Sequence, residues 1–76
     1  MDIYEKCDDV RTKEDLIAFI KSLKVDLDKN KDEWENLSLE MYLDAIEAWM
    51  TDTNTLSDKP NWNSFAQILL SGRFYE

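Results

Sequence analysis

The apolar residues of the chain recur at helical spacing in three separate stretches. The first stretch contains Leu16, Ile20, Leu23 and Leu27. Spacings of four, three and four residues place such side chains on one face of an α-helix. Thr12 precedes the stretch and Asp15 stands three residues after it, as at the capped start of a helix. This pattern predicts a helix over residues 12–28.

The second stretch follows Ser38, whose hydroxyl suits the N-cap of a helix. Its apolar positions are Leu39, Tyr42, Leu43, Ile46, Trp49 and Met50. On a helix these residues lie along one side, whereas Glu40, Asp44 and Glu47 lie along another. We predict a helix over residues 39–51 that turns its apolar side inward and a row of carboxylates toward water.

The third stretch begins with Asn61 at the N-cap position. Its apolar stripe is formed by Trp62, Phe65, Ala66 and Leu69. This stripe predicts a helix over residues 61–75. Residues 51–60 are polar and lack periodicity, so we expect a surface loop there. Trp34 precedes the second helix, and we expect a short extra turn near residues 31–36 that packs this side chain onto the helices.

These elements predict an all-α fold, a compact three-helix bundle. A chain of 76 residues with one glycine and one proline has few turn-forming residues, which disfavours a many-stranded β fold. We expect residues 12–76 to form a single helical domain and residues 1–11 a partly ordered N-terminal arm. A domain of this size hides only about 60% of its unfolded surface, so its large apolar residues must share one core. The expected core residues are Leu16, Ile20, Leu23, Leu27, Trp34, Leu39, Leu43, Ile46, Trp49, Trp62, Phe65, Ala66 and Leu69.

Two blocks of the sequence carry a resemblance to a known family. The first block reads WENLSL at residues 34–39, YLxA at residues 42–45 and then Trp49; the second reads PNWxxFAxIL at residues 60–69 and closes on Tyr75-Glu76. Over roughly residues 10–76 the chain resembles a family of small, acidic, all-helical bacterial proteins classed as a domain of unknown function. The resemblance implies a helical fold and a bacterial origin, and it assigns no activity, ligand or catalytic residue.

The reactive residues of the chain argue against an enzyme. There is no histidine, the commonest general base near neutral pH. The only glycine, Gly72, lies within a predicted helix, so no glycine-rich loop could hold a phosphate. Cys7 has no histidine to activate it, and its acidic neighbours Asp8 and Asp9 would raise its pKa. We therefore expect no catalytic site and no cofactor.

One acidic run is superficially similar to the start of a calcium-binding loop. Oxygen side chains stand at alternate positions in Asp26-x-Asp28-x-Asn30-x-Asp32. The sixth position of such a loop needs glycine and the twelfth needs glutamate. Lys31 and Leu37 stand at these two positions instead. We interpret the run as a solvated helix end and predict no metal site.

The distribution of charge is the one feature that points to a function. The formal net charge is −8, and between Asp32 and Asp58 the chain has eight acidic residues and no lysine or arginine. Acids three or four residues apart on a helix repel each other, so stability alone would favour added lysines. One interpretation is a solubilising face; the other is a docking surface for a basic protein partner. The candidate partner-binding residues are Glu40, Asp44, Glu47, Glu33, Glu35 and Asp52.

The favoured hypothesis is a non-catalytic acidic interaction module that docks onto or neutralises a basic protein, as small immunity proteins do. The sequence pI of about 4.3 opposes direct binding of nucleic acid. One alternative is a structural or self-associating helical domain with an exposed aromatic patch of Trp34, Tyr75 and Tyr4. A second alternative is a nucleic-acid mimic that competes for a basic groove. We expect a monomer or a weak homodimer.

The compartment is suggested by the cysteine count and by the hydropathy of the chain. Cys7 is the only cysteine, so no internal disulfide can form, which suits a reducing compartment. The first nine residues carry no signal sequence. No stretch approaches the roughly 18 apolar residues that would span a bilayer. We expect a cytoplasmic protein without a membrane partner.

Overall fold

The computed structural model of the chain describes residues 2–56 and 58–75. Its elements are α1 (Ile3–Asp8), α2 (Lys13–Lys29), the 3-10 helix η1 (Lys31–Glu33), α3 (Leu39–Asp52) and α4 (Trp62–Phe74). No described residue lies in a strand, so the predicted all-α class is confirmed. Each of the three long helices begins and ends within one residue of its predicted range, and η1 lies where the extra turn was expected.

Each long helix begins at the side-chain cap that the sequence predicts. The cap oxygen accepts a hydrogen bond from the backbone N–H three residues later: Asp15 to Thr12 at 3.1 Å, Met41 to Ser38 at 3.1 Å and Ser64 to Asn61 at 2.8 Å. Asp2 caps α1 in the same way. A cap of this kind stabilises a helix by about 1 kcal/mol and fixes where it starts.

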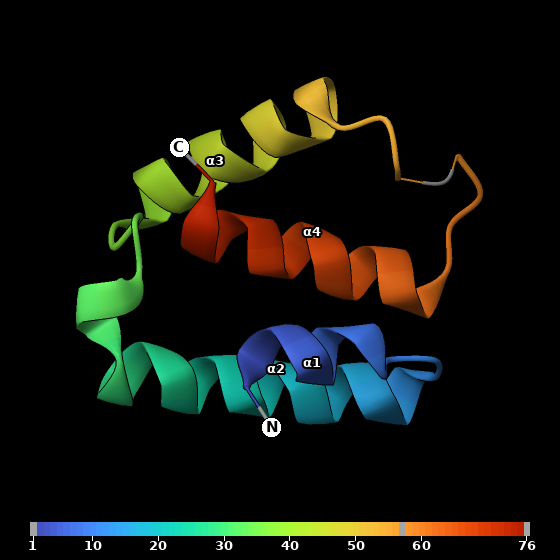
Figure 1. Cartoon of the computed structure of the whole chain (residues 1–76), viewed down its shortest axis with the longest axis horizontal. Coiled ribbons are helices and arrows are strands. Elements are labelled where there is room, and N and C mark those ends of the chain that lie inside the picture. Colours follow the sequence, from blue (N-terminus) through green and yellow to red (C-terminus); the bar gives the residue numbers. More distant parts are fainter. Residues whose placement is uncertain (1, 57, 76) are drawn as a thin grey trace.

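Helix α4 is the centre of the molecule (Figure 1). It packs against α1, α2 and α3, with its most extensive contact on α3. Helices α2 and α3 are described in full, and no Cα atom of one comes within 8 Å of a Cα atom of the other. In a closed three-helix bundle each helix would contact both others. Here α2 and α3 instead flank α4, and we call the space between them the slot.

The N-terminal residues, expected to form an arm, contribute to the core. Residues 3–8 form α1, which packs on α2 and α4. Ile3, Cys7 and Val10 are buried together with Phe19, Leu23, Ala66 and Leu70. Ile3 and Cys7 stand four residues apart and so share one face of α1, and Val10 follows just after the end of this helix.

The expected core is only partly correct. Leu23 and Ala66 are buried, and Leu16, Trp34 and Leu69 pack against the core while partly buried. Ile46 and Trp49 are half-buried. Six expected core residues are exposed, namely Ile20, Leu27, Leu39, Leu43, Trp62 and Phe65. Because α2 and α3 do not pack on each other, the four of these residues that lie on α2 and α3 lack a helix to cover them. Trp62 and Phe65 lie in the first turn of α4, where their rings contact each other edge to face.

The only glycine lets α3 approach α4 closely. The ring of Tyr42 lies directly over Gly72, where an added Cβ would overlap three of its ring carbons. The Tyr42 hydroxyl donates a hydrogen bond to the carbonyl oxygen of Leu69 at 2.5 Å. Glycine inside a helix costs about 1 kcal/mol relative to alanine, and here the close ring contact explains its presence.

Arg73 joins α4 to three other segments. Its Nε donates to Oδ2 of Asp26 at 2.6 Å, its Nη1 donates to the Tyr4 hydroxyl at 2.9 Å, and its Nη2 lies 3.5 Å from Oε2 of Glu33. Trp34 Nε1 donates to the same Asp26 oxygen at 2.6 Å. Burial alone would raise the pKa of Asp26, but these hydrogen bonds, that of Arg73 first, outweigh burial and lower it. The pair is therefore ionised and structural.

Candidate interaction surface

Three of the six predicted partner-binding residues form an exposed row on α3. Glu40, Asp44 and Glu47 follow each other at helical spacing, and all three are exposed. No lysine or arginine among the described residues forms an ion pair with any of them. Glu40 lies in the first turn of α3, where the helix dipole favours an acid, whereas Glu47 lies nearer the other end. We call these residues the acidic row.

The other three predicted residues make separate contacts within the chain. Glu33 lies on η1 and faces Arg73 across 3.5 Å. Asp52 accepts a hydrogen bond from the Tyr75 hydroxyl at 2.5 Å. It stands five residues after Glu47, which turns it away from the acidic row. Glu35 precedes α3, and its backbone N–H donates to the carbonyl oxygen of Arg73 at 3.0 Å. The structure therefore does not join these three to the acidic row.

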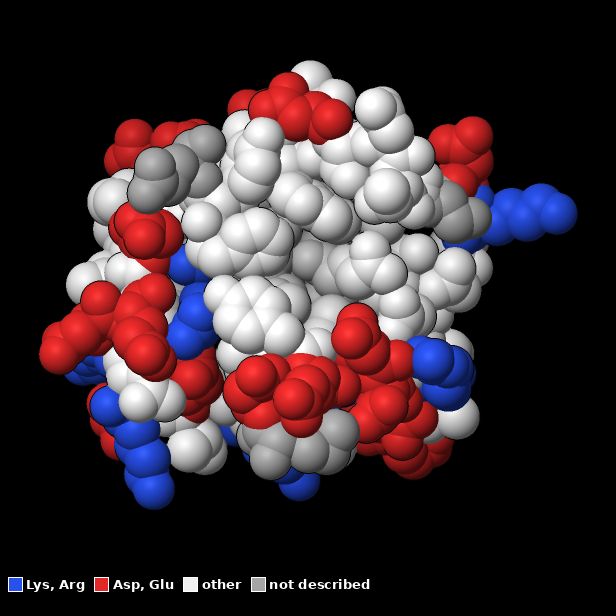
Figure 2. Space-filling model, in the orientation of Figure 1, with Lys and Arg blue, Asp and Glu red and all other residues white. Residues whose placement is uncertain are grey.

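Charge is concentrated at the margins of the face shown in Figure 2. Acidic residues lie along its edges, and the centre, over α3 and α4, is uncharged. An uneven distribution of this kind gives the surface distinct acidic edges instead of a uniform negative coat. Potentials that differ between patches are what orient a charged partner as it approaches.

The aromatic residues expected to form a self-association patch are engaged inside the chain. The guanidinium carbon of Arg73 lies 5.5 Å from the ring centre of Tyr4 and 5.9 Å from that of Trp34. Trp34 and Tyr75 are half-buried, and each donates a hydrogen bond to a carboxylate. Cation–π contacts of this kind stabilise the fold. Most of the large exposed apolar residues are aliphatic instead.

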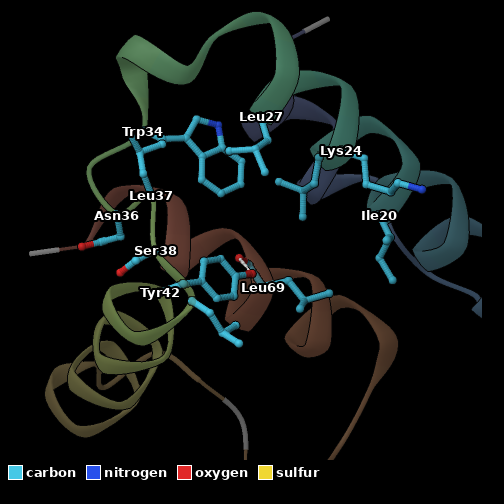
Figure 3. A pocket seen from close by; sticks show the side chains of 11 residues that line it. Ile20, Lys24, Leu27, Trp34, Asn36, Leu37, Ser38, Tyr42 and Leu69 are labelled. Carbon is cyan, nitrogen blue, oxygen red and sulfur yellow. Dashed lines mark hydrogen bonds between the residues drawn. The ribbon is translucent and has the colours of Figure 1, made fainter.

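The slot contains an apolar cavity of about 350 Å³, which no pattern in the sequence predicted. Its walls include Ile20 and Leu27 of α2 and Leu39 and Tyr42 of α3, with Leu69 of α4 between them. Figure 3 shows the rings of Trp34 and Tyr42 pointing into this space from opposite sides. The sequence signal for this cavity was the width of the apolar side of α3. That side is broader than packing against α4 alone requires.

The acidic run and the cysteine that the sequence singled out can be placed in the structure. Between residues 2–56 and 58–75, no three His, Cys, Asp or Glu side chains are placed to hold a metal ion. The carboxylate of Asp26, the first residue of the calcium-like run, forms an ion pair with Arg73. Cys7 is a buried free thiol, and burial together with the charge of Asp8 raises its pKa to about 11. This thiol is therefore protonated at neutral pH and is a poor nucleophile.

The fold and this surface define a small, acidic, all-helical domain with an exposed carboxylate row. The chain belongs to the Family of unknown function (DUF7660), whose model matches residues 12–76. No curated protein and no solved structure matches the chain. The matched range begins at the cap of α2 and so excludes α1. In the described part of the chain, no helix combines the length and the apolar character needed to cross a membrane.

Proposed function

We propose that this protein is a non-catalytic interaction module that docks onto a basic protein partner through the acidic row. The observation that supports the proposal is the exposure of Glu40, Asp44 and Glu47 on successive turns of α3, with no lysine or arginine of the described chain paired to them. Repulsion among these carboxylates destabilises the helix by about 0.2–0.5 kcal/mol per pair. A basic partner would relieve this repulsion on binding.

Electrostatics would govern both the speed and the selectivity of such docking. Opposite potentials accelerate encounter and disfavour partners of the wrong charge. The net charge of −8 keeps the molecule attractive to a basic surface beyond the row itself. In its sharpest form the proposal is neutralisation of a basic protein, in the manner of an immunity protein. We take the compartment to be the cytoplasm because Cys7 has no cysteine partner in the chain.

Charge reversal tests the proposal against a control of equal net charge. Changing Glu40, Asp44 and Glu47 to lysine should abolish capture of basic proteins from a lysate of the native host by the tagged chain. The matched control changes three exposed acids elsewhere to lysine, namely Asp8, Asp9 and Asp28. Both variants gain the same positive charge, so a row-specific effect separates them.

The captured proteins are identified by mass spectrometry, purified and measured again with each variant. Circular dichroism confirms that both variants remain helical. The proposal requires the row variant to lose binding while the control retains it. Equal binding by both variants, or an equal loss in both, would contradict docking through the acidic row.

A further inference from the structure

The slot exposes two apolar helix edges that face each other. Ile20 and Leu27 on α2 and Leu39 on α3 are exposed and line the cavity in the slot. Helical spacing places the exposed Ile17 on the same edge of α2, and Leu43 and Met50 on the same edge of α3. Leu39 is 73% exposed and Leu43 is 55% exposed, although both belong to the apolar side of α3. Contiguous exposed patches of this kind are uncommon on monomers and mark contact surfaces.

The two rims of the slot carry charges of opposite sign. Lys24 lines the slot from α2, and Lys13 stands eleven residues earlier, three helical turns away on the same edge. On α3, Glu40 and Glu47 each follow directly after a residue of the apolar side and so border it. No ion pair joins these four charges to any described residue.

A surface with an apolar centre, one basic rim and one acidic rim is complementary to a rotated copy of itself. A two-fold axis parallel to the slot places α2 of one copy over α3 of the other. The apolar edges then meet, and each Lys24 faces a Glu40. Lys24 and Glu40 lie at the same height along the slot, because Lys24 and Leu39, the neighbour of Glu40, line the same cavity.

The directions of the helices extend this match along the slot. Figure 1 shows α2 and α3 running in opposite directions on either side of α4. A position seven residues before Lys24 on α2 therefore lies at the same height along the slot as a position seven residues after Glu40 on α3. Both displacements are about 10 Å. This step brings Ile17 level with Glu47, and Lys13 lies about one helical turn further along α2. A two-fold axis across the slot would instead place lysines over lysines and acids over acids.

We propose that the slot is the interface of a homodimer, in which α2 of each copy covers α3 of the other. This inference does not rest on the proposed function, although Glu40 and Glu47 belong to both surfaces. Asp44 lines a different hollow with Met41 and Ala48, on the far side of α3 from the slot. The dimer therefore leaves Asp44 open to a basic partner, whereas Glu40 and Glu47 border the interface.

Sedimentation of the full chain from micromolar to millimolar concentration tests the interface. The mass should rise from 9.0 kDa toward twice that value. Leu43→Asp should hold the protein at the monomer mass, because it buries a charge in the apolar centre. Met41→Asp is the matched control: Met41 is also an exposed apolar residue near the start of α3, and it faces away from the slot. A wild-type chain that stays monomeric throughout, or equal behaviour of the two variants, overturns the proposal.

A charge exchange tests the orientation of the two copies. Lys24→Glu alone and Glu40→Lys alone should each weaken self-association about tenfold, because two rim pairs change from attraction to repulsion. A mixture of the two variants should form heterodimers as stable as the wild-type dimer, since both rim pairs are then of opposite charge. Native mass spectrometry distinguishes these species if one variant carries a tag. A statistical mixture without preferred heterodimers would contradict the parallel axis.

Discussion

The packing of α3 on α4 predicts an unusual response to the substitution Gly72→Ala. Alanine is the best helix former and glycine is a poor one, so this change inside an exposed helix stabilises by about 1 kcal/mol. Here the new Cβ would overlap the ring of Tyr42. The ring is also held by its hydrogen bond to Leu69. It therefore cannot move aside without losing that bond.

The net effect follows from these opposing contributions. Overpacking in a filled site costs about 1–3 kcal/mol. Loss of the Tyr42 hydrogen bond costs about 1 kcal/mol more. Against the gain of about 1 kcal/mol from helix propensity, Gly72→Ala should lower the free energy of unfolding by about 1–3 kcal/mol.

Urea unfolding followed by far-UV circular dichroism measures this free energy. The decisive control is the same substitution in a Tyr42→Ala background, in which the ring is absent. There Gly72→Ala should stabilise the protein by about 1 kcal/mol, so the sign of the effect reverses. Stabilisation by Gly72→Ala in the wild-type background, or the same effect in both backgrounds, would refute the close contact between α3 and α4.

Three further predictions concern the buried charged and reactive groups. Arg73→Met should lower the free energy of unfolding by about 3–5 kcal/mol, because it leaves the partly buried Asp26 carboxylate without its cation; a loss below about 1 kcal/mol in urea unfolding would contradict a structural ion pair. The pKa of Asp26 is lower in the folded chain than its ordinary value of 3.8, so the stability it contributes is complete above that value and is lost as the pH falls through the folded pKa. Asp26→Asn should therefore flatten the acid side of the stability profile, and an unchanged acid slope would argue against this role. Cys7 should react with iodoacetamide at mildly alkaline pH only when the chain unfolds, because its folded pKa is about 11; rapid alkylation of the native protein would contradict its burial.

The three long helices could be predicted from the sequence because their signals are local. Thr12, Ser38 and Asn61 each cap the backbone three residues later, and this contact depends on no distant part of the chain. Helix α1 escaped prediction because six residues are too few to establish a helical period. The signals in this segment were the cap residue Asp2 and the spacing of Ile3 and Cys7.

The slot could not be predicted because periodicity identifies an apolar face without identifying what covers it. Leu39 and Leu43 lie on the apolar side of α3, as the spacing indicates, yet they remain exposed because α2 does not reach them. The ion pair of Asp26 and Arg73 joins residues 47 positions apart, so no local pattern signals it. The acidic row, in contrast, could be predicted, because helical spacing alone places its three carboxylates on the exposed side of α3.

Docking through the acidic row is tested most directly by the salt dependence of the dissociation constant for the captured basic partner. The measurement compares the wild type, the variant with Glu40, Asp44 and Glu47 changed to lysine, and the control variant of equal net charge. Wild type and control should bind tightly at low salt and weaken steeply as salt is added, because screening shortens the range of the attraction. The row variant should bind weakly at every salt concentration. If its dissociation constant and salt dependence equal those of the control, the acidic row is not the docking surface.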